Sequence, residues 1–221
     1  MLRSRLKMNP YYDRTEAGRQ LAGHLMHYAD RPDVLVLGLP RGGVAVAHEV
    51  ARELHVLLDI FLVRKLGVPG HEELALGAIA SGGVRVLNAD LVKSLGISEK
   101  TIDEIAAEEE RELKRREKLY RGERAPVDVR GRIIILVDDG LATGATMRAA
   151  VAALQRQHPA RIVVAVPVAA RDTCADFAEE VDEVICAKMP DPFMAVGLWY
   201  EHFPQLTDEE VRELLMENVH S

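Results

Sequence analysis

Two adjacent carboxylates, Asp138 and Asp139, stand between an apolar run and a loop of small residues. The run 133–137 precedes them, and the loop 140–146 follows with two glycines, two alanines and two threonines. Small residues let a backbone curl closely around an anion, and the free N–H groups at the start of a helix can donate to it. Two carboxylates beside such a loop suit hydroxyl groups or a metal. The combination predicts a site for a phosphorylated sugar.

Other readings of this segment fit less well. A turn in which an aspartate merely caps the next helix needs only one carboxylate. A Walker A loop is excluded because no lysine follows Gly144, and no G-x-G-x-x-G motif follows a strand. A haloacid-dehalogenase-type phosphatase would need Asp-x-Asp after a strand, and the chain contains no such pattern.

The elements that must position this loop alternate between strands and helices. Apolar runs predict strands at 33–39, 56–63, 132–137, 162–168 and 181–186, and helical spacing predicts helices at 13–28, 43–54, 98–120, 145–157 and 172–178. This alternation indicates an α/β fold with an open, doubly wound, mostly parallel sheet. Ligands of such sheets bind beyond the C-terminal ends of the strands. We therefore expect residues 40–43, 64–65 and 138–146 to share one rim.

The stretch between the second strand and the charged helix is less regular. Residues 64–83 contain five glycines and a proline, which favours a mobile loop. Short β segments are expected at 76–80 and 84–87. Ser98 is the predicted N-cap of the charged helix. Its thin apolar stripe favours a solvated helix packed along one edge, with a dimer contact as the alternative.

Composition limits the class of protein. The 221 residues are 48% hydrophobic but only 5% aromatic, which suits a single α/β domain over 1–221 with an aliphatic core. A net charge of -7 argues against nucleic acid as a partner. No segment reads as a signal peptide or a membrane span, so a cytoplasmic protein without membrane contact is expected. Cys174 and Cys186 lack metal-ligand spacing and are expected to be reduced, buried thiols.

Residues 133–146 resemble the phosphoribosyl-pyrophosphate (PRPP) signature of type I phosphoribosyltransferases. That signature is an apolar strand, two acidic residues and a small loop ending in Thr-Gly-x-Thr. The resemblance implies that Asp138 and Asp139 are the catalytic pair and hold the ribose 2′- and 3′-hydroxyls. It also implies that the 5′-phosphate is wrapped by Ala142, Thr143, Gly144, Ala145 and Thr146.

Two further segments fit the same family. Leu39-Pro40-Arg41-Gly42-Gly43 resembles its short pyrophosphate loop, so Arg41, Gly42 and Gly43 are expected to bind pyrophosphate. Arg64 and Lys65 resemble basic residues that contact pyrophosphate, and the segment after them lies where the family has a catalytic lid. An ordinary strand-to-helix turn and a polar strand end are the alternatives.

The family resemblance implies a reaction and its partners. PRPP would donate its phosphoribosyl group to a nitrogenous base, releasing pyrophosphate with Mg²⁺ as cofactor and with no permanent metal site. The alternatives are a PRPP-sensing regulatory protein without transferase activity and a reaction of another phosphorylated sugar. Homodimers are common in the family.

A hood made from the chain ends recognises the base in this family, which implies contributions from about 1–30 and 187–221. Phe193 resembles the residue that stacks on the base of 6-oxopurine enzymes, and Lys188 resembles one that meets an exocyclic oxygen. Packing of a C-terminal helix onto the core is the alternative. Ala142 stands where the 6-oxopurine enzymes carry an aspartate, so the sequence assigns no particular base.

Overall fold

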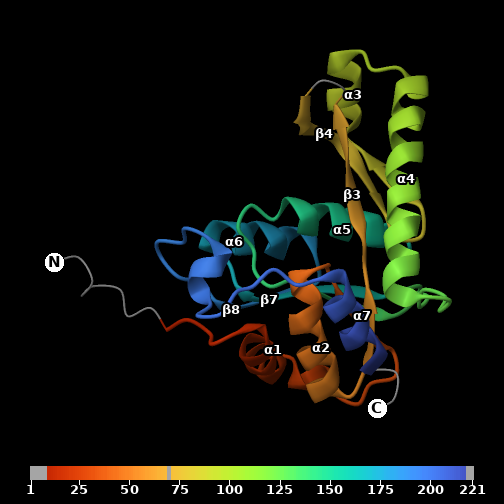
Figure 1. Cartoon of the computed structure of the whole chain (residues 1–221). Helices are drawn as coiled ribbons and strands as arrows, with labels where there is room; N and C mark the ends of the chain where they lie inside the picture. Colours follow the sequence, from red (N-terminus) through yellow and green to blue (C-terminus); the bar gives the residue numbers. More distant parts are fainter. Residues whose placement is uncertain (1–8, 69–70, 218–221) are drawn as a thin grey trace.

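A five-stranded parallel sheet lies at the centre of the protein (Figure 1). The computed structural model describes residues 9–68 and 71–217, without the side chains of residues 71–74. In spatial order the strands are β2 (Leu57–Ile60), β1 (Val34–Gly38), β6 (Ile133–Val137), β7 (Arg161–Val168) and β8 (Glu183–Lys188). All four pairings are parallel. The predicted open, doubly wound α/β sheet is confirmed.

The two middle strands are buried along their whole length. Every residue of β1 and of β6 is buried, as expected for parallel strands covered on both faces. Gly38 pairs with Val137, and the Leu39 N–H donates to the Val137 carbonyl over 2.9 Å. Strands β1 and β6 therefore end side by side, and the loops that follow them start from neighbouring points.

Helices cover both faces of the sheet. Figure 1 shows α5 and α6 on one face and α1 and α2 on the other. The helices of this part are α1 (Arg14–Gly23), α2 (Gly42–Leu54), α5 (Ala145–Gln155), α6 (Arg171–Glu180) and α7 (Asp208–Glu217), with 3-10 turns at Met26–Tyr28 and Val196–Trp199. A C-terminal helix entered the sequence analysis only as an alternative and without bounds; α7 packs against α2 and α4.

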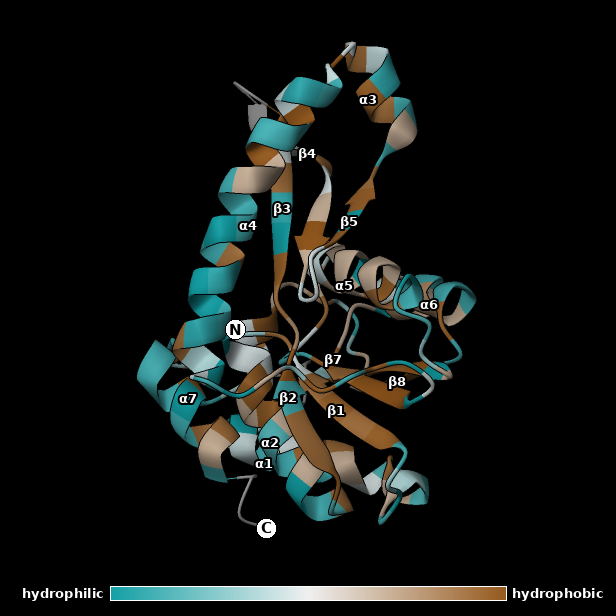
Figure 2. Cartoon of the chain, turned by 90° about the vertical axis from the view of Figure 1, so that its right-hand side faces the viewer, coloured by the Kyte–Doolittle hydropathy of each residue, from teal (hydrophilic) through white to brown (hydrophobic). Residues whose placement is uncertain are grey.

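Residues 63–121 form an arm that stands away from the central sheet (Figures 1 and 2). Strands β3 (Val63–Val68), β4 (His71–Ala80) and β5 (Val84–Leu87) make an antiparallel sheet, followed by α3 (Ala89–Leu95) and α4 (Glu99–Arg121). Most of the segment 64–83, which was predicted to include a mobile loop, is paired strand, and the β segments expected at 76–80 and 84–87 are found. Gly77 shows why: a Cβ there would lie 2.0 Å from the Val86 carbonyl, so this glycine permits close strand pairing.

Helix α4 begins and packs as predicted. Ser98 caps it, with its hydroxyl accepting from the Thr101 N–H over 3.1 Å. Its apolar stripe, including Ile102 and Leu113, is buried, while the rest of the surface is hydrophilic (Figure 2). No helix in the described ranges is both long and apolar enough to cross a membrane.

The prediction of two reduced thiols is wrong. Cys174 of α6 and Cys186 of β8 form a disulfide, with their Cα atoms 6.6 Å apart. The connection between α6 and β8 is short, and the helix packs back against the strand that follows it. This contact places the two cysteines opposite each other, which their spacing in the sequence did not indicate.

Candidate active site

The acidic pair lies at the C-terminal end of β6. Asp138 and Asp139 are both half-buried, and the Asp139 N–H donates to Asp138 Oδ1 over 2.8 Å. Burial raises the pKa of Asp138 well above its usual range, and the neighbouring charge of Asp139 raises it further. Burial also raises the pKa of Asp139, against the opposing pull of the Arg14 guanidinium. Two carboxylates with these surroundings are suited to accept hydrogen bonds from hydroxyl groups.

The loop before α2 packs directly on the acidic pair. A Cβ at Gly43 would lie 2.8 Å from the Asp138 Cα atom, and one at Gly42 would lie 1.9 Å from Asp139 Oδ2. Neither position has room for a side chain, so the backbone itself meets the carboxylates. The Pro40–Arg41 peptide bond is cis. The structure thus brings the predicted pyrophosphate loop against the predicted ribose site.

The loop after the acidic pair leads into the start of α5. Ala142, Thr143, Ala145 and Thr146 are exposed, and N-cap Gly144 makes no side-chain cap. The first N–H groups of a helix have no carbonyl partner within it, and the helix dipole adds positive potential there. This end of α5 can therefore donate several backbone hydrogen bonds to a phosphate.

Helix α6 and the first turns of α5 hold this phosphate loop in shape. The Thr173 hydroxyl donates to the Ala142 carbonyl over 2.6 Å. Arg148 Nη1 donates to the Thr143 carbonyl over 2.8 Å. Because two loop carbonyls are bonded to side chains behind the loop, the backbone is fixed before any ligand binds.

Gly144 is the most restricted residue of this loop. Its φ of 72° is left-handed, and a Cβ would lie 2.6 Å from the Phe177 ring. We expect Gly144→Ala to lower the free energy of unfolding by about 1–3 kcal/mol and to weaken phosphate binding, because strain and the clash displace the loop. Urea denaturation and titration with PRPP measure the two effects.

Gly83→Ala is the matched control for that substitution. Gly83 has a similar φ of 73°, but nothing lies within 4 Å of its added Cβ. It carries the conformational strain without the contact with a ring. Equal losses of stability in the two variants, or unaltered ligand affinity in Gly144→Ala, would contradict the role given to the Phe177 contact.

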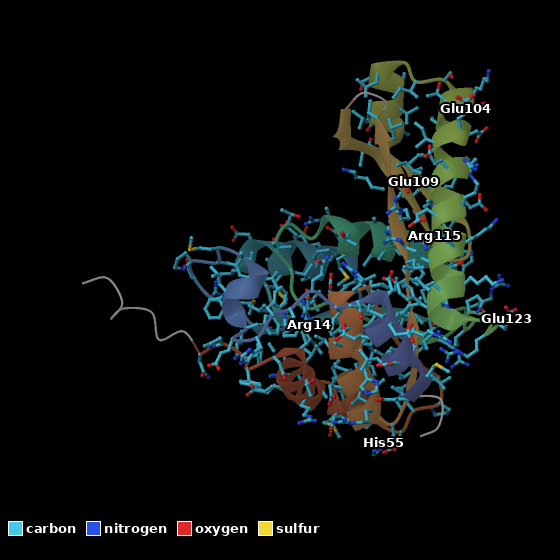
Figure 3. The ribbon with its side chains drawn as sticks, viewed as in Figure 1. Arg14, His55, Glu104, Glu109, Arg115 and Glu123 are labelled. Carbon is cyan, nitrogen blue, oxygen red and sulfur yellow. A yellow bond between two sulfur atoms is a disulfide. The ribbon has the colours of Figure 1, made fainter. Side chains whose placement is uncertain are left out.

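Arg64 and Lys65 lie in the arm and not at the end of a central strand. Successive side chains of a strand point to opposite sides, so the two diverge. Arg64 Nε donates to Glu109 of α4 over 2.6 Å, and Figure 3 shows Glu109 on the side of α4 that faces the strands. Lys65 is exposed and lines a cavity of about 370 Å³ with Ala145 and Thr146. The expected common rim is therefore corrected: only Lys65 of this pair lies beside the phosphate loop.

The two chain ends meet next to the site. The Tyr11 N–H donates to the Trp199 carbonyl over 2.8 Å, and Tyr11 pairs with Tyr200 in a parallel bridge. Lys188 Nζ donates to the Asn9 carbonyl over 2.8 Å and lies 3.5 Å from the centre of the Tyr11 ring. Residues 1–8 and 218–221 of the expected hood lie outside the described residues.

The other predicted base-binding residue packs in the same region. Phe193 is half-buried and contacts the cluster of Tyr11, Trp199 and Tyr200. Lys188 and Phe193 therefore both make contacts within the protein. These contacts agree with the packing alternative, while the base-binding role stays a prediction.

Three residues that the sequence did not single out complete the site. Arg14 contacts Asp139 Oδ2 through Nε at 2.9 Å and Nη2 at 2.8 Å. The Tyr200 hydroxyl donates to the Asp139 carbonyl over 2.6 Å. The Arg14 guanidinium lies 3.8 Å from the centre of the Phe203 ring, which stacks on Tyr200. The cluster of aromatic residues near the C-terminus was the available signal, while Arg14 had none.

Comparison with known proteins identifies this architecture. Residues 11–191 match the family described as "Phosphoribosyl transferase domain". The chain belongs to this family. The match includes the acidic pair, the loop before α2, the phosphate loop and the arm.

Individual relatives agree with the family. "Putative phosphoribosyl transferase Rv0571c" of Mycobacterium tuberculosis is 46% identical over 204 residues, which are 92% of this chain. The chain spans about half the length of that relative, 46%. "Bifunctional protein PyrR" of Chloroflexus aurantiacus is 33% identical over 57% of this chain and 65% of its own length. The crystal structure of TT1426 from Thermus thermophilus superposes with a TM-score of 0.83 at 42% identity, covering 94% of this chain and 98% of that one.

Proposed function

We propose that this phosphoribosyl transferase domain transfers the phosphoribosyl group of PRPP to a nitrogenous base and releases pyrophosphate. The observation that carries the proposal is the contact between two loops at the acidic pair. Backbone at Gly42 and Gly43 meets Asp138 and Asp139, and the phosphate loop continues from the same pair. One sugar carrying phosphates at both ends matches such an arrangement.

Each part of the proposed site has a physical role. The carboxylates of Asp138 and Asp139 accept hydrogen bonds from the two ribose hydroxyls. The N–H groups of residues 142–146 bind the 5′-phosphate at the start of α5. Arg41 and the backbone of Gly42 and Gly43 bind the pyrophosphate.

Lys65 is the proposed cation from the arm. It lies beside Thr146 in a shared cavity and can approach a phosphate there. Arg64 is paired with Glu109, so its proposed contact with pyrophosphate requires that this ion pair opens. Of the two basic residues, Lys65 is therefore the better placed to contribute to PRPP binding.

Positioning and charge stabilisation would supply the rate enhancement. Loss of pyrophosphate leaves positive charge on the sugar ring, and nearby carboxylates stabilise that charge. Holding the sugar at both ends keeps the anomeric carbon in line with the incoming base. No proton transfer by a histidine is required of this site.

Mg²⁺ enters this proposal as part of the substrate. The described residues include no group of three or more His, Cys, Asp or Glu side chains that could hold a metal ion. Mg²⁺ keeps several waters and is often held mainly by substrate phosphates, which is compatible with this set of side chains. Bound to the pyrophosphate, it would neutralise charge on the leaving group.

The experiment is an incubation with PRPP, Mg²⁺ and a pool of purine and pyrimidine bases, followed by mass spectrometry. A new nucleotide that forms with the natural protein, and not with Asp138→Asn/Asp139→Asn, supports the transferase and identifies its base. No nucleotide together with no measurable PRPP binding would refute the proposal.

A second candidate is a PRPP-binding regulatory protein without transferase activity. The observation in its favour is that side chains at the acidic pair and in the predicted base site are held by contacts within the protein. Arg14 lies on the Phe203 ring, and Lys188 is bonded to Asn9. PRPP binding without any nucleotide product in the same incubation would favour this candidate.

A further inference from the structure

Arg14 makes an unusually complete set of contacts for a residue of the first helix. Its Nε and Nη2 both contact Asp139 Oδ2, and its Nη1 donates to the Pro204 carbonyl over 2.8 Å. The flat guanidinium lies on the Phe203 ring at 3.8 Å. The Arg14 and Asp139 side chains are only 10% and 17% exposed, so water screens their attraction weakly. Figure 3 marks Arg14 near the middle of the molecule, far from the labelled residues of α4.

The C-terminal segment holds the backbone of the same residue. The Tyr200 hydroxyl donates to the backbone carbonyl of Asp139, and the Tyr200 ring stacks on Phe203 with centroids 4.8 Å apart. Arg14, Tyr200 and Phe203 thus form one cluster around Asp139. Both ends of the chain contribute to it, although neither end contains the PRPP signature.

The contact of Arg14 is selective for one carboxylate oxygen. Both N–H groups point to Oδ2, and that oxygen also occupies the space where a Gly42 side chain would be. No side chain of the described residues forms a hydrogen bond with Oδ1 of Asp139. Two N–H groups on one oxygen hold the position of that oxygen by charge-assisted hydrogen bonds. This contact leaves the second oxygen of the carboxylate available to a hydroxyl donor.

We propose that Arg14 is a positioning residue, which fixes Asp139 through Oδ2 so that Oδ1 can accept a hydrogen bond from a ribose hydroxyl of PRPP. This inference rests on the proposed function of the acidic pair. Arg14 itself touches neither the sugar nor its phosphates. It acts through Asp139, and Phe203 and Pro204 hold it in place.

The surrounding charges make the arrangement sensitive to pH. The charged and titratable groups that face Asp139 are Arg14 from α1, Asp138 beside it and Tyr200 from the C-terminal segment, while the loop before α2 presents backbone at Gly42. Burial raises the pKa of Asp139, and Arg14 opposes that rise. Without Arg14 the carboxyl would stay protonated to a higher pH. PRPP binding, which needs the carboxylate, would then begin at a higher pH.

The test compares Arg14→Gln with the natural protein by PRPP titration across a series of pH values. We expect affinity at neutral pH to fall by about tenfold or more, because Asp139 loses the contact that keeps it ionised and in place for its charge-assisted hydrogen bond with the ribose. We also expect the rise of affinity with pH to move to higher pH. Arg14→Lys keeps the charge without the fork, so it should restore the pH range but not the full affinity.

Arg19→Gln is the matched control on the same helix. Arg19 pairs with Glu49 of α2 at 3.0 Å, away from the acidic pair. An equal change of the pH range in Arg19→Gln, or an unchanged range in Arg14→Gln, would overturn the proposal. Should Arg14→Gln not fold, Phe203→Leu removes the ring beneath the guanidinium and should shift the range in the same direction.

A measurement without PRPP separates this inference from the proposed function. In protein labelled with [¹³Cγ]aspartate, the Asp139 resonance is assigned by its loss in Asp139→Asn and followed with pH. A higher pKa of Asp139 in Arg14→Gln is expected, and an unchanged pKa contradicts the inference. If the natural protein binds no PRPP, the proposed function fails, while this titration still decides the role of Arg14.

Discussion

Replacing Asp138 and Asp139 together by asparagine is expected to reduce PRPP affinity by about a hundredfold or more. A hydrogen bond to a charged group contributes about 1.5–3 kcal/mol, and the double variant weakens two of them. Asparagine keeps the size of each side chain, so the loops beside the pair keep their packing. Isothermal titration with PRPP and Mg²⁺ measures the effect, and the incubation with bases should yield no nucleotide.

The control changes the same charge elsewhere. Asp90 and Asp128 are exposed aspartates outside the site, and Asp90→Asn/Asp128→Asn should leave PRPP affinity within about twofold of the natural value. Affinity that is unchanged in Asp138→Asn/Asp139→Asn would remove the acidic pair from the site. Equal losses in both double variants would show that net charge, and not these two carboxylates, governs binding.

The single variant Asp138→Asn separates binding from stability. The pKa of Asp138 is higher in the folded protein than its ordinary value, because burial and the charge of Asp139 disfavour ionisation. Between the ordinary pKa of aspartate and the raised pKa of Asp138, the folded state therefore binds more protons than the unfolded state. The free energy of unfolding falls as pH rises through this window. Asparagine removes this fall, so the variant should gain stability relative to the natural protein as pH increases, while it loses PRPP affinity.

The central sheet and the signature loop could be predicted because both depend on residues that are close together in the sequence. The run 133–137 is entirely apolar and entirely buried, and the loop after it needs no distant residue to be recognised. Pairing of β1 with β6 was not required for either prediction. The general rule that ligands of such sheets bind beyond the C-terminal ends of the strands predicted only a shared rim for the two loops.

In the arm, the β segments at 76–80 and 84–87 and the charged helix could be predicted by the same means, but the strand pairing over 64–83 could not. Its glycines suggest flexibility when read alone, whereas Gly77 is required by the close passage of the Val86 carbonyl. That requirement depends on a partner strand and is invisible in composition. The same holds for Arg14, which is separated from Asp139 by 125 positions and meets it only after the chain ends come together. Contacts of this kind arise from packing between elements and leave no periodic pattern.

A buried ion pair joins the arm to the central sheet. Arg121 ends α4, and its Nε contacts both carboxylate oxygens of Asp59 on β2 at 2.9 and 3.1 Å. The two side chains are 5% and 8% exposed. Asp59 also accepts from the N–H groups of Ile60 and Val127, and Arg121 Nη2 donates to the Ile60 carbonyl over 2.7 Å. In the natural protein, both carboxylate oxygens of Asp59 therefore accept hydrogen bonds from the Arg121 side chain and from the backbone.

Asp59→Ala is expected to lower the free energy of unfolding by about 3–5 kcal/mol, because the buried Arg121 loses its buried partner and keeps only the half-buried Glu117 on Nη1. Two backbone N–H groups lose their acceptor in the same step. Urea denaturation monitored by circular dichroism measures the loss. Glu112→Ala is the control: its exposed contacts with Arg115 and Arg116 within α4 should contribute no more than about 1 kcal/mol in total.

The double variant Asp59→Leu/Arg121→Met tests whether the charge or the packing dominates. Removing both charges leaves apolar groups of similar length, and such replacements are often neutral or stabilising. We expect it to be more stable than Asp59→Ala by about 2 kcal/mol or more. A double variant as unstable as Asp59→Ala would mean that the N–H groups of Ile60 and Val127, rather than the loss of the Asp59 charge beside Arg121, account for the loss of stability. Because Lys65 belongs to the arm that this network anchors, the double variant should also retain PRPP affinity where Asp59→Ala loses part of it.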